Sequence, residues 1–209
     1  MNLELKSSRR GFLRSTALVG GGLVVAIAVP GARRFAWAQE AQPAAFAPNA
    51  FLRIAADDSI TVLLAHAEMG QGIWTTLPML INEELDADWS KIRVEHSPAS
   101  AADYGMPGFG GMQITGGSTS TWMEFDRYRL AGATARQMLV EAAAKRFNVA
   151  PSQIRTEPGV VIAGEQRATY GELANDAGQL PVPDPASIKL KEPKDWTLIG
   201  KPTPRLDTP

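Results

Sequence analysis

The chain has 209 residues, of which 44% are hydrophobic, and a formal net charge of -1 at pH 7. These values predict one globular domain with extensions, and they exclude a strongly basic nucleic-acid-binding protein and a disordered tail. With no cysteine and only two histidines, the sequence supplies no disulfide framework, no cysteine ligands for an iron–sulfur centre and no ordinary zinc site. A metal, if one takes part, must arrive inside a cofactor.

Residues 1–38 carry the ordered segments of a twin-arginine signal peptide. The pattern SSRRGFL at Ser7–Leu13 precedes an apolar run at Thr16–Val29, and Ala36-Trp37-Ala38 has the small-x-small form that a signal peptidase cleaves. The apolar run is short and glycine-rich for a membrane span of ~20 residues, although a chance Arg-Arg pair beside a membrane anchor is the alternative. We therefore expect the twin-arginine export machinery to carry the folded chain to the periplasm, where an uncleaved signal would leave it membrane-associated.

A Pro/Ala-rich linker at residues 39–50 precedes a domain predicted over residues 51–178. The domain begins with two strands, at Phe51–Ala55 and Ile60–Ala65, whose alternation and β-branched residues are typical of a strand pair. Apolar residues then recur at helical spacing from Met69 to Asp86. This spacing predicts a helix.

Acidic residues gather near the end of this helix, mostly on the side opposite the apolar residues. They are interpreted as a solvated helix face, namely Glu83, Glu84, Asp86 and Asp88. Apolar and polar residues alternate at Ile92–His96, which predicts a strand. Residues 97–117 have no strong period and many small residues, which is typical of a binding or lid loop.

The longest predicted helix runs from Ser118 to about Phe147 and buries a stripe of small and medium side chains. Ser118 or Thr119 can cap this helix, and Glu124 lies close enough to its start to favour the positive end of the helix dipole.

A small strand at residues 160–163 and a short helix at residues 169–177 complete the domain. The order of strands and helices predicts an α+β fold, a mixed sheet with packed helices. Residues 179–209 are rich in proline and are predicted to form an extended arm that leads toward a missing domain.

Two glycine turns are the most informative features of the sequence. The segments AEMGQGIWTT at Ala67–Thr76 and QITGGSTST at Gln113–Thr121 each lead into a predicted helix. A helix start presents unpaired backbone N–H groups and attracts an anion such as phosphate. Either motif alone is also compatible with a glycine-rich helix start that has no ligand. The pair, in this order, predicts one extended ligand with several anionic or hydrogen-bond-accepting groups, held from two sides.

Residues near the two turns have simpler structural interpretations. His66 is predicted to be a satisfied, partly buried histidine rather than a ligand, and His96 a surface residue at a strand end. Trp74 and Trp122 are expected in the core or an interface rather than in a substrate funnel. Glu68 is expected to be a capping or first-turn carboxylate, not a catalytic base.

The two turns also carry a family resemblance. EMGQG at Glu68–Gly72, followed by LPMLI and EEL, resembles a pterin-binding segment of the molybdenum hydroxylases, the xanthine dehydrogenase and aldehyde oxidase family. TGGSTS at Thr115–Ser120, followed by RLAGA at Arg129–Ala133, is similar to the next cofactor-binding segment of that family. With YGELA at Tyr170–Ala174 and LIGK at Leu198–Lys201, the order of segments resembles that of isoquinoline 1-oxidoreductase beta (large) subunits and related exported, molybdopterin-binding aldehyde dehydrogenases.

The resemblance runs from about Leu52 to the C-terminus and implies the α+β molybdopterin-binding domain of the aldehyde oxidase and xanthine dehydrogenase type. It implies molybdenum held by a pterin dithiolene, commonly extended in bacteria to molybdopterin cytosine dinucleotide, with no metal ligand from this chain. Enzymes of the family hydroxylate N-heterocycles or oxidise aldehydes with oxygen from water. The implied partners are the remainder of the large subunit, a small 2Fe-2S subunit that takes the electrons and, as a further candidate, a c-type cytochrome, with no nucleic acid.

The resemblance also implies which residues contact the cofactor. Gly70, Gln71 and Gly72 would approach the pterin or its phosphate, and the Gln71 amide would donate to an oxo or pterin group. Glycine permits close backbone approach and positive φ, and hydroxyl groups add donors for phosphate oxygens. The pyrophosphate or nucleotide end would be held by Thr115, Gly116, Gly117, Ser118, Thr119 and Ser120.

The sequence departs from the family in its length. The family's large subunit is much longer, and the motif with its catalytic glutamate has no counterpart here, so the catalytic residue is unknown. We expect this chain to be the N-terminal part of such a subunit, inactive alone, whether as a truncated product, a split subunit or a fragment. The alternative is a non-catalytic periplasmic binding or scaffold module that keeps the fold without cofactor.

Overall fold

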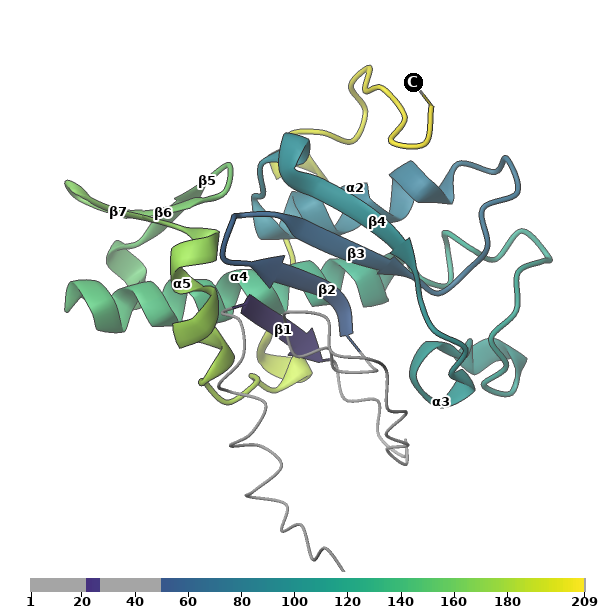
Figure 1. Cartoon of the computed structure of the whole chain (residues 1–209), viewed down its shortest axis with the longest axis horizontal. Coiled ribbons are helices and arrows are strands. Elements are labelled where there is room, and N and C mark those ends of the chain that lie inside the picture. Colours follow the sequence, from purple (N-terminus) through teal and green to yellow (C-terminus); the bar gives the residue numbers. More distant parts are fainter. Residues whose placement is uncertain (1–21, 27–49, 209) are drawn as a thin grey trace, which may run out of the picture.

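The domain consists of a sheet with helices packed against it (Figure 1). The computed structural model describes residues 22–26 and 50–208. The main elements are β1 (Gly22–Ala26), β2 (Ala50–Ala55), β3 (Ile60–Leu64), α2 (Ile73–Leu85), β4 (Ile92–His96), α4 (Phe125–Phe147) and α5 (Tyr170–Gly178). Short helical segments lie between them, namely η1 (Trp89–Lys91), α3 (Ala101–Tyr104) and η2 (Pro107–Phe109).

The four strands of the main sheet follow the order β1-β2-β3-β4. Strand β2 is antiparallel to both β1 and β3, whereas β4 is parallel to β3, with Leu64 opposite His96. A parallel pair needs a crossover connection, and α2 supplies it. Helices α2 and α4 lie behind the sheet in the view of Figure 1. The predicted mixed sheet with packed helices is confirmed.

Strand β1 falls inside the apolar run at Thr16–Val29 that belongs to the predicted signal peptide. It pairs with β2, and Gly22 lies opposite Ala55. The other residues of the predicted signal peptide lie outside the described residues, so the signal peptide stays a prediction. Within residues 22–26 and 50–208, no helix is long and apolar enough to cross a membrane.

A second, three-stranded sheet follows α4. It consists of β5 (Arg155–Glu157), β6 (Val160–Ala163) and β7 (Gln166–Thr169) after the turn η3 (Pro151–Gln153). Only β6 was predicted, because β5 and β7 are short and mostly polar. The predicted short helix is α5, and its first turn is closed by a capping box in which Thr169 and Glu172 exchange hydrogen bonds.

Helix α2 begins later than its apolar pattern indicates. It starts at Ile73 rather than at Met69. Gly70 and Gly72 have φ angles of 102° and 88°, a conformation that a right-handed helix cannot contain. The GQG motif is therefore a turn ahead of the helix and not its first residues.

The start of α4 also differs from the prediction. The helix begins at Phe125, and residues 118–124 form turns rather than its first two turns. Ser118 has a left-handed φ of 59°, and the Thr119 hydroxyl donates to the Gly116 carbonyl at 2.7 Å. Neither side chain caps α4, whose N-cap residue is Glu124. The second glycine motif consequently does not lie at a helix N-terminus.

The acidic stretch at the end of α2 was predicted to be a solvated face, and this prediction is wrong for Glu83 and Glu84. Glu83 and Glu84 have only 1% and 0% of their surface exposed. The Glu83 carboxylate accepts the backbone N–H groups of Thr197, Leu198 and Ile199 at 2.5–2.7 Å. Three successive donors of the C-terminal arm are thus satisfied by one buried side chain.

Glu84 and Asp86 hold an earlier part of the same arm. Glu84 accepts the backbone N–H of Lys191 at 3.0 Å and pairs with the Arg129 guanidinium at 2.8 Å. The Lys191 ammonium pairs with Asp86. The arm includes the turns η4 (Pro185–Ser187) and η5 (Pro193–Asp195), and these contacts bring it back across α2.

We predict that Glu83→Gln lowers the free energy of unfolding by about 2 kcal/mol, because hydrogen bonds to a charged group are worth roughly 1.5–3 kcal/mol. The amide nitrogen of glutamine would also face a backbone donor. Urea unfolding would measure the loss, and hydrogen exchange at residues 197–199 should accelerate. Glu165→Gln, at an exposed position, is the control and should change neither. Unchanged exchange in the arm of the Glu83 variant would contradict the assignment.

Helices α2 and α4 cross in close contact at Gly132. A Cβ atom at this position would lie 2.4 Å from the Ile81 carbonyl oxygen. Neighbouring residues on the same stripe are small or flexible, including Ala131, Ala135 and Met138, all buried. The small-residue stripe predicted from the sequence is therefore the surface on which α2 rests.

We expect Gly132→Ala to destabilise the domain by about 1–3 kcal/mol, the usual cost of an extra methyl group in a packed core. Thermal unfolding followed by circular dichroism would measure it. Gly116→Ala is the matched control, because its added Cβ meets nothing within 4 Å and its φ is not positive. Equal stability of the two variants would show that the helices can move apart without cost.

Candidate functional site

The two glycine segments meet at one end of the main sheet. The first lies between β3 and α2, and the second lies between the loop after β4 and α4. Because β3 and β4 are parallel, their carboxyl ends lie at the same edge, on the right in Figure 1. Loops beyond the carboxyl ends of parallel strands commonly form ligand sites.

Direct hydrogen bonds join the two segments. The Ala67 N–H donates to the Thr115 hydroxyl oxygen at 2.8 Å, and Nδ1 of His66 lies 2.8 Å from the Ile114 carbonyl oxygen. Residues that are 48 positions apart are thus adjacent in space. The two segments therefore lie side by side at these residues.

Tyr128 of α4 anchors the first segment to the core. Its hydroxyl donates to the Leu63 carbonyl at 2.8 Å and accepts the Ala65 N–H at 2.9 Å, which extends the hydrogen bonding of β3. Its ring packs against Phe51 with centroids 5.1 Å apart. Burial, together with the nearby charge of Glu124, raises the pKa of the Tyr128 hydroxyl well above its usual value. The hydroxyl therefore remains a donor.

The Glu68 carboxylate accepts backbone N–H groups at the start of α2. One oxygen accepts the N–H groups of Gly70 and Gly72 at 2.7 and 3.0 Å, and the other accepts the N–H of Trp74 at 2.8 Å. The predicted capping role is confirmed. Partial burial by itself raises the pKa of this carboxyl, but the three backbone donors outweigh it, and the pKa lies below the ordinary 4.5.

Gln71 is fixed inside the same turn. Its amide oxygen accepts the Met69 N–H at 2.6 Å, and its amide nitrogen donates to the Ala67 carbonyl at 2.7 Å. These bonds orient the amide plane and leave the second N–H of the side chain for a ligand.

The second segment keeps its backbone donors open. In the described ranges, no hydrogen bond uses the N–H groups of Gly116, Gly117 or Ser118. A Cβ at Gly116 would meet nothing within 4 Å, so the space in front of this backbone is free. Ser120 is buried and Ser118 is exposed. The segment therefore offers consecutive donors to an anion without the help of a helix dipole.

Several large apolar side chains in and near the two segments are exposed. Met69 and Trp122 are 69% and 65% exposed, and Met112 and Phe109 are 54% and 37% exposed. Trp122 was expected in the core or an interface; it is not in the core of this domain, and the interface stays a prediction. Apolar walls with a few placed polar groups are typical of ligand sites and of interfaces.

The two histidines behave as predicted, except that His66 is more deeply buried. Its exposed fraction is 2%, and its Nε2 lies 3.2 Å from a carboxylate oxygen of Glu124. His96 is exposed at the end of β4, with its ring 4.8 Å from that of Trp74. The described residues contain no cluster of histidine and carboxylate groups that could hold a metal ion.

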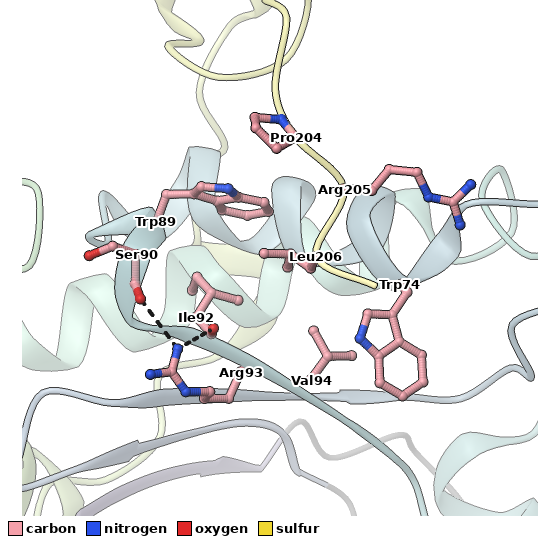
Figure 2. A pocket seen from close by; sticks show the side chains of 9 residues that line it. All are labelled: Trp74, Trp89, Ser90, Ile92, Arg93, Val94, Pro204, Arg205 and Leu206. Carbon is pink, nitrogen blue, oxygen red and sulfur yellow. Dashed lines mark hydrogen bonds between the residues drawn. The ribbon is translucent and has the colours of Figure 1, made fainter. Parts of the chain in front are cut away.

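A separate groove of about 490 Å³ lies beside the first turn of α2 (Figure 2). Arg93 lies at one side of the groove, next to Ser90 and Ile92, and donates to the carbonyl groups of both residues. The rest of the groove is lined by Trp74, Trp89, Val94, Pro204, Arg205 and Leu206. None of the nine predicted cofactor-binding residues lines it, so the groove is distinct from the glycine segments.

The sequence pattern of one protein family, described as a molybdopterin cofactor-binding domain, matches residues 3–205. The chain belongs to this family.

Relatives of this molybdopterin cofactor-binding domain are enzymes of greater length. The chain is 37% identical, over 98% of its length, to isoquinoline 1-oxidoreductase subunit beta of Brevundimonas diminuta. It is 32% identical, over 92% of its length, to a membrane-bound aldehyde dehydrogenase (pyrroloquinoline-quinone) of Gluconacetobacter polyoxogenes. It spans only 30% and 25% of the lengths of these two proteins. The structure of reconstituted CO dehydrogenase from Oligotropha carboxidovorans aligns with 59% of this chain and 15% of its own, at 24% identity and a TM-score of 0.48.

The two glycine segments of this molybdopterin cofactor-binding domain fit the cofactor in different ways. Added Cβ atoms at Gly70, Gly72 and Gly116 meet nothing within 4 Å, so a flat ring can approach the backbone of both segments. The second segment offers three consecutive open N–H groups, whereas in the first segment Glu68 takes those of Gly70, Gly72 and Trp74. A phosphate at the GQG turn would meet this carboxylate and be repelled.

We predict that Glu68→Gln lowers the free energy of unfolding at pH 7 by about 1 kcal/mol, the usual cost of a lost helix cap. The ionised carboxylate stabilises the fold above its unfolded pKa, and this contribution is lost as the pH falls through the lowered folded pKa. The difference from the wild type should therefore shrink below pH 4.5. Urea unfolding at several pH values measures this, with Glu165→Gln as the control. A difference independent of pH would contradict the role of the charge.

Proposed function

We propose that this chain forms the cofactor-binding part of the large subunit of a molybdenum-dependent oxidoreductase. The adjacency of the GQG and TGGSTS segments carries the proposal, because hydrogen bonds at Ala67 and His66 bring both to one open surface. The names of its relatives support hydroxylation of N-heterocycles or oxidation of aldehydes as the reaction class. When bound, the molybdenum–pterin group would supply the transfer of oxygen from water to substrate.

The position of the Glu68 carboxylate supports the proposal that the two segments contact different parts of the cofactor. Gly70 and Gly72 would lie against the neutral pterin, because their N–H groups are already taken. The oriented amide of Gln71 would donate its remaining N–H to the pterin or an oxo group. Molybdopterin cytosine dinucleotide is the form we propose, with its pyrophosphate at the donors of Gly116–Ser118.

Other parts of the enzyme would complete the site. This chain assigns no catalytic residue, and the relatives that it matches are more than three times its length. We propose that the remainder of the large subunit supplies the reacting residues, and that a 2Fe-2S subunit and a c-type cytochrome accept the electrons. The designation of a relative as subunit beta supports a multi-subunit assembly. The twin-arginine pattern at Ser7–Leu13 supports a periplasmic location.

We expect Gly116→Val to reduce the molybdenum bound per protein strongly while leaving the fold intact. The added side chain enters only the open space in front of the backbone, where the ligand would lie, and φ at this position is not positive. Protein purified from cells that make the cofactor would be assayed for molybdenum by mass spectrometry and for pterin by fluorescence after acid oxidation. Circular dichroism would report the fold.

Ser152→Val, at an exposed position on η3, is the control and should retain the wild-type molybdenum content. Equal molybdenum in the Gly116 variant and the wild type would refute the assignment of this segment. Absence of both molybdenum and pterin from the wild type would favour the non-catalytic binding or scaffold module.

A further inference from the structure

A buried ionic cluster lies beneath the two glycine segments. Glu124 is fully buried, and one of its oxygens lies 3.2 Å from Nε2 of His66 and accepts from the Arg127 guanidinium at 2.8 Å. Its second oxygen is buried without a partner in the described structure. Charged groups are rarely removed from water unless they are paired and hydrogen-bonded, so this cluster is costly to assemble.

Two members of the cluster hold loop backbone. His66 bonds through Nδ1 to the Ile114 carbonyl, directly before the TGGSTS segment. Arg127 donates to the carbonyl groups of Asp103 and Gly105, in the segment after β4, at 3.1 and 3.3 Å. Glu124 joins His66 to Arg127. The segment that contains His66 and two separate parts of the connection after β4 are thus tied to one carboxylate.

The His66 ring is held at both of its nitrogens. The Ile114 carbonyl oxygen faces Nδ1 at 2.8 Å, and a carboxylate oxygen of Glu124 faces Nε2 at 3.2 Å. Arg127 is held in addition by the face of Phe51, 4.8 Å from the ring centroid.

We propose that Glu124 and His66 are positioning residues that set the distance between the GQG turn and the TGGSTS segment. The proposal rests on the function proposed above, because the spacing matters only if one ligand contacts both segments. Neither side chain contacts the ligand. Glu124 fixes the His66 ring, and the ring holds the second segment beside the first.

Two substitutions separate this role from a general contribution to stability. Glu124→Gln removes the charge and places an amide N–H against one of the two donors. His66→Asn keeps a donor at the position of Nδ1, and therefore the bond to Ile114, but cannot reach Glu124. Glu84→Gln is the matched control, because Glu84 is equally buried and ion-paired to Arg129 but binds the arm instead of the loops.

We expect Glu124→Gln to lower the molybdenum retained per protein about tenfold, the effect of losing one hydrogen bond to a charged group. His66→Asn should retain more cofactor than His66→Ala. Hydrogen exchange at Ala67 and at residues 113–120 should accelerate in Glu124→Gln. Glu84→Gln should retain its cofactor, although its unfolding temperature should fall by about as much as that of Glu124→Gln.

Equal loss of cofactor in Glu84→Gln and Glu124→Gln would overturn the proposal, since both effects would then follow from stability alone. Unchanged exchange at Ala67 in Glu124→Gln would overturn it as well. If the wild type binds no molybdenum or pterin, the proposed function fails. Even then, hydrogen exchange in the two segments tests whether Glu124 holds them together.

Discussion

Three carboxylates hold the irregular parts of this domain in place. Glu68 satisfies three N–H groups ahead of α2, and the buried Glu83 satisfies three more in the C-terminal arm. The buried Glu124 joins His66 to Arg127 under the loops. Irregular backbone has no ladder partners, and each buried donor left unsatisfied would cost roughly 1–3 kcal/mol. The shape of the loops and of the arm therefore depends on where these three side chains lie.

Helix α2 connects these anchoring points to one another. Glu68 closes its start, and Glu83 binds the arm near its end. The arm then returns to the start of the helix, where the Leu206 N–H donates to the Thr75 hydroxyl at 2.9 Å and the Arg205 guanidinium lies 3.9 Å from Glu68. The arm thus contacts the same carboxylate that shapes the GQG turn. A displacement of the arm would therefore change the surroundings of Glu68 and of the GQG turn.

Local patterns in the sequence were enough to locate the regular elements. The strands β2, β3 and β4 and the bodies of α2 and α4 were predicted correctly, because apolar periodicity reports burial within one element. The helix starts were wrong, since periodicity does not reveal the positive φ of Gly72 or Ser118. The solvated interpretation of the acidic stretch was wrong because its partners are remote. Glu83 and Glu84 bind residues 114 and 107 positions away, which no local pattern contains.

The candidate site, too, could be predicted only in part from local sequence patterns. The sequence identified both glycine segments, and the resemblance named their family, but it treated the two turns as equivalent. They differ because the first contains a carboxylate two residues before its glycine, whereas residues 113–121 contain none. A carboxylate within reach consumes the donors that a glycine turn exposes, so Glu68 makes the first turn unsuitable for an anion. The second turn keeps its donors although it does not begin a helix. A surface with open but neutral backbone on one side and free N–H groups on the other suits a ligand that is itself divided, with an uncharged ring at one end and a phosphate at the other.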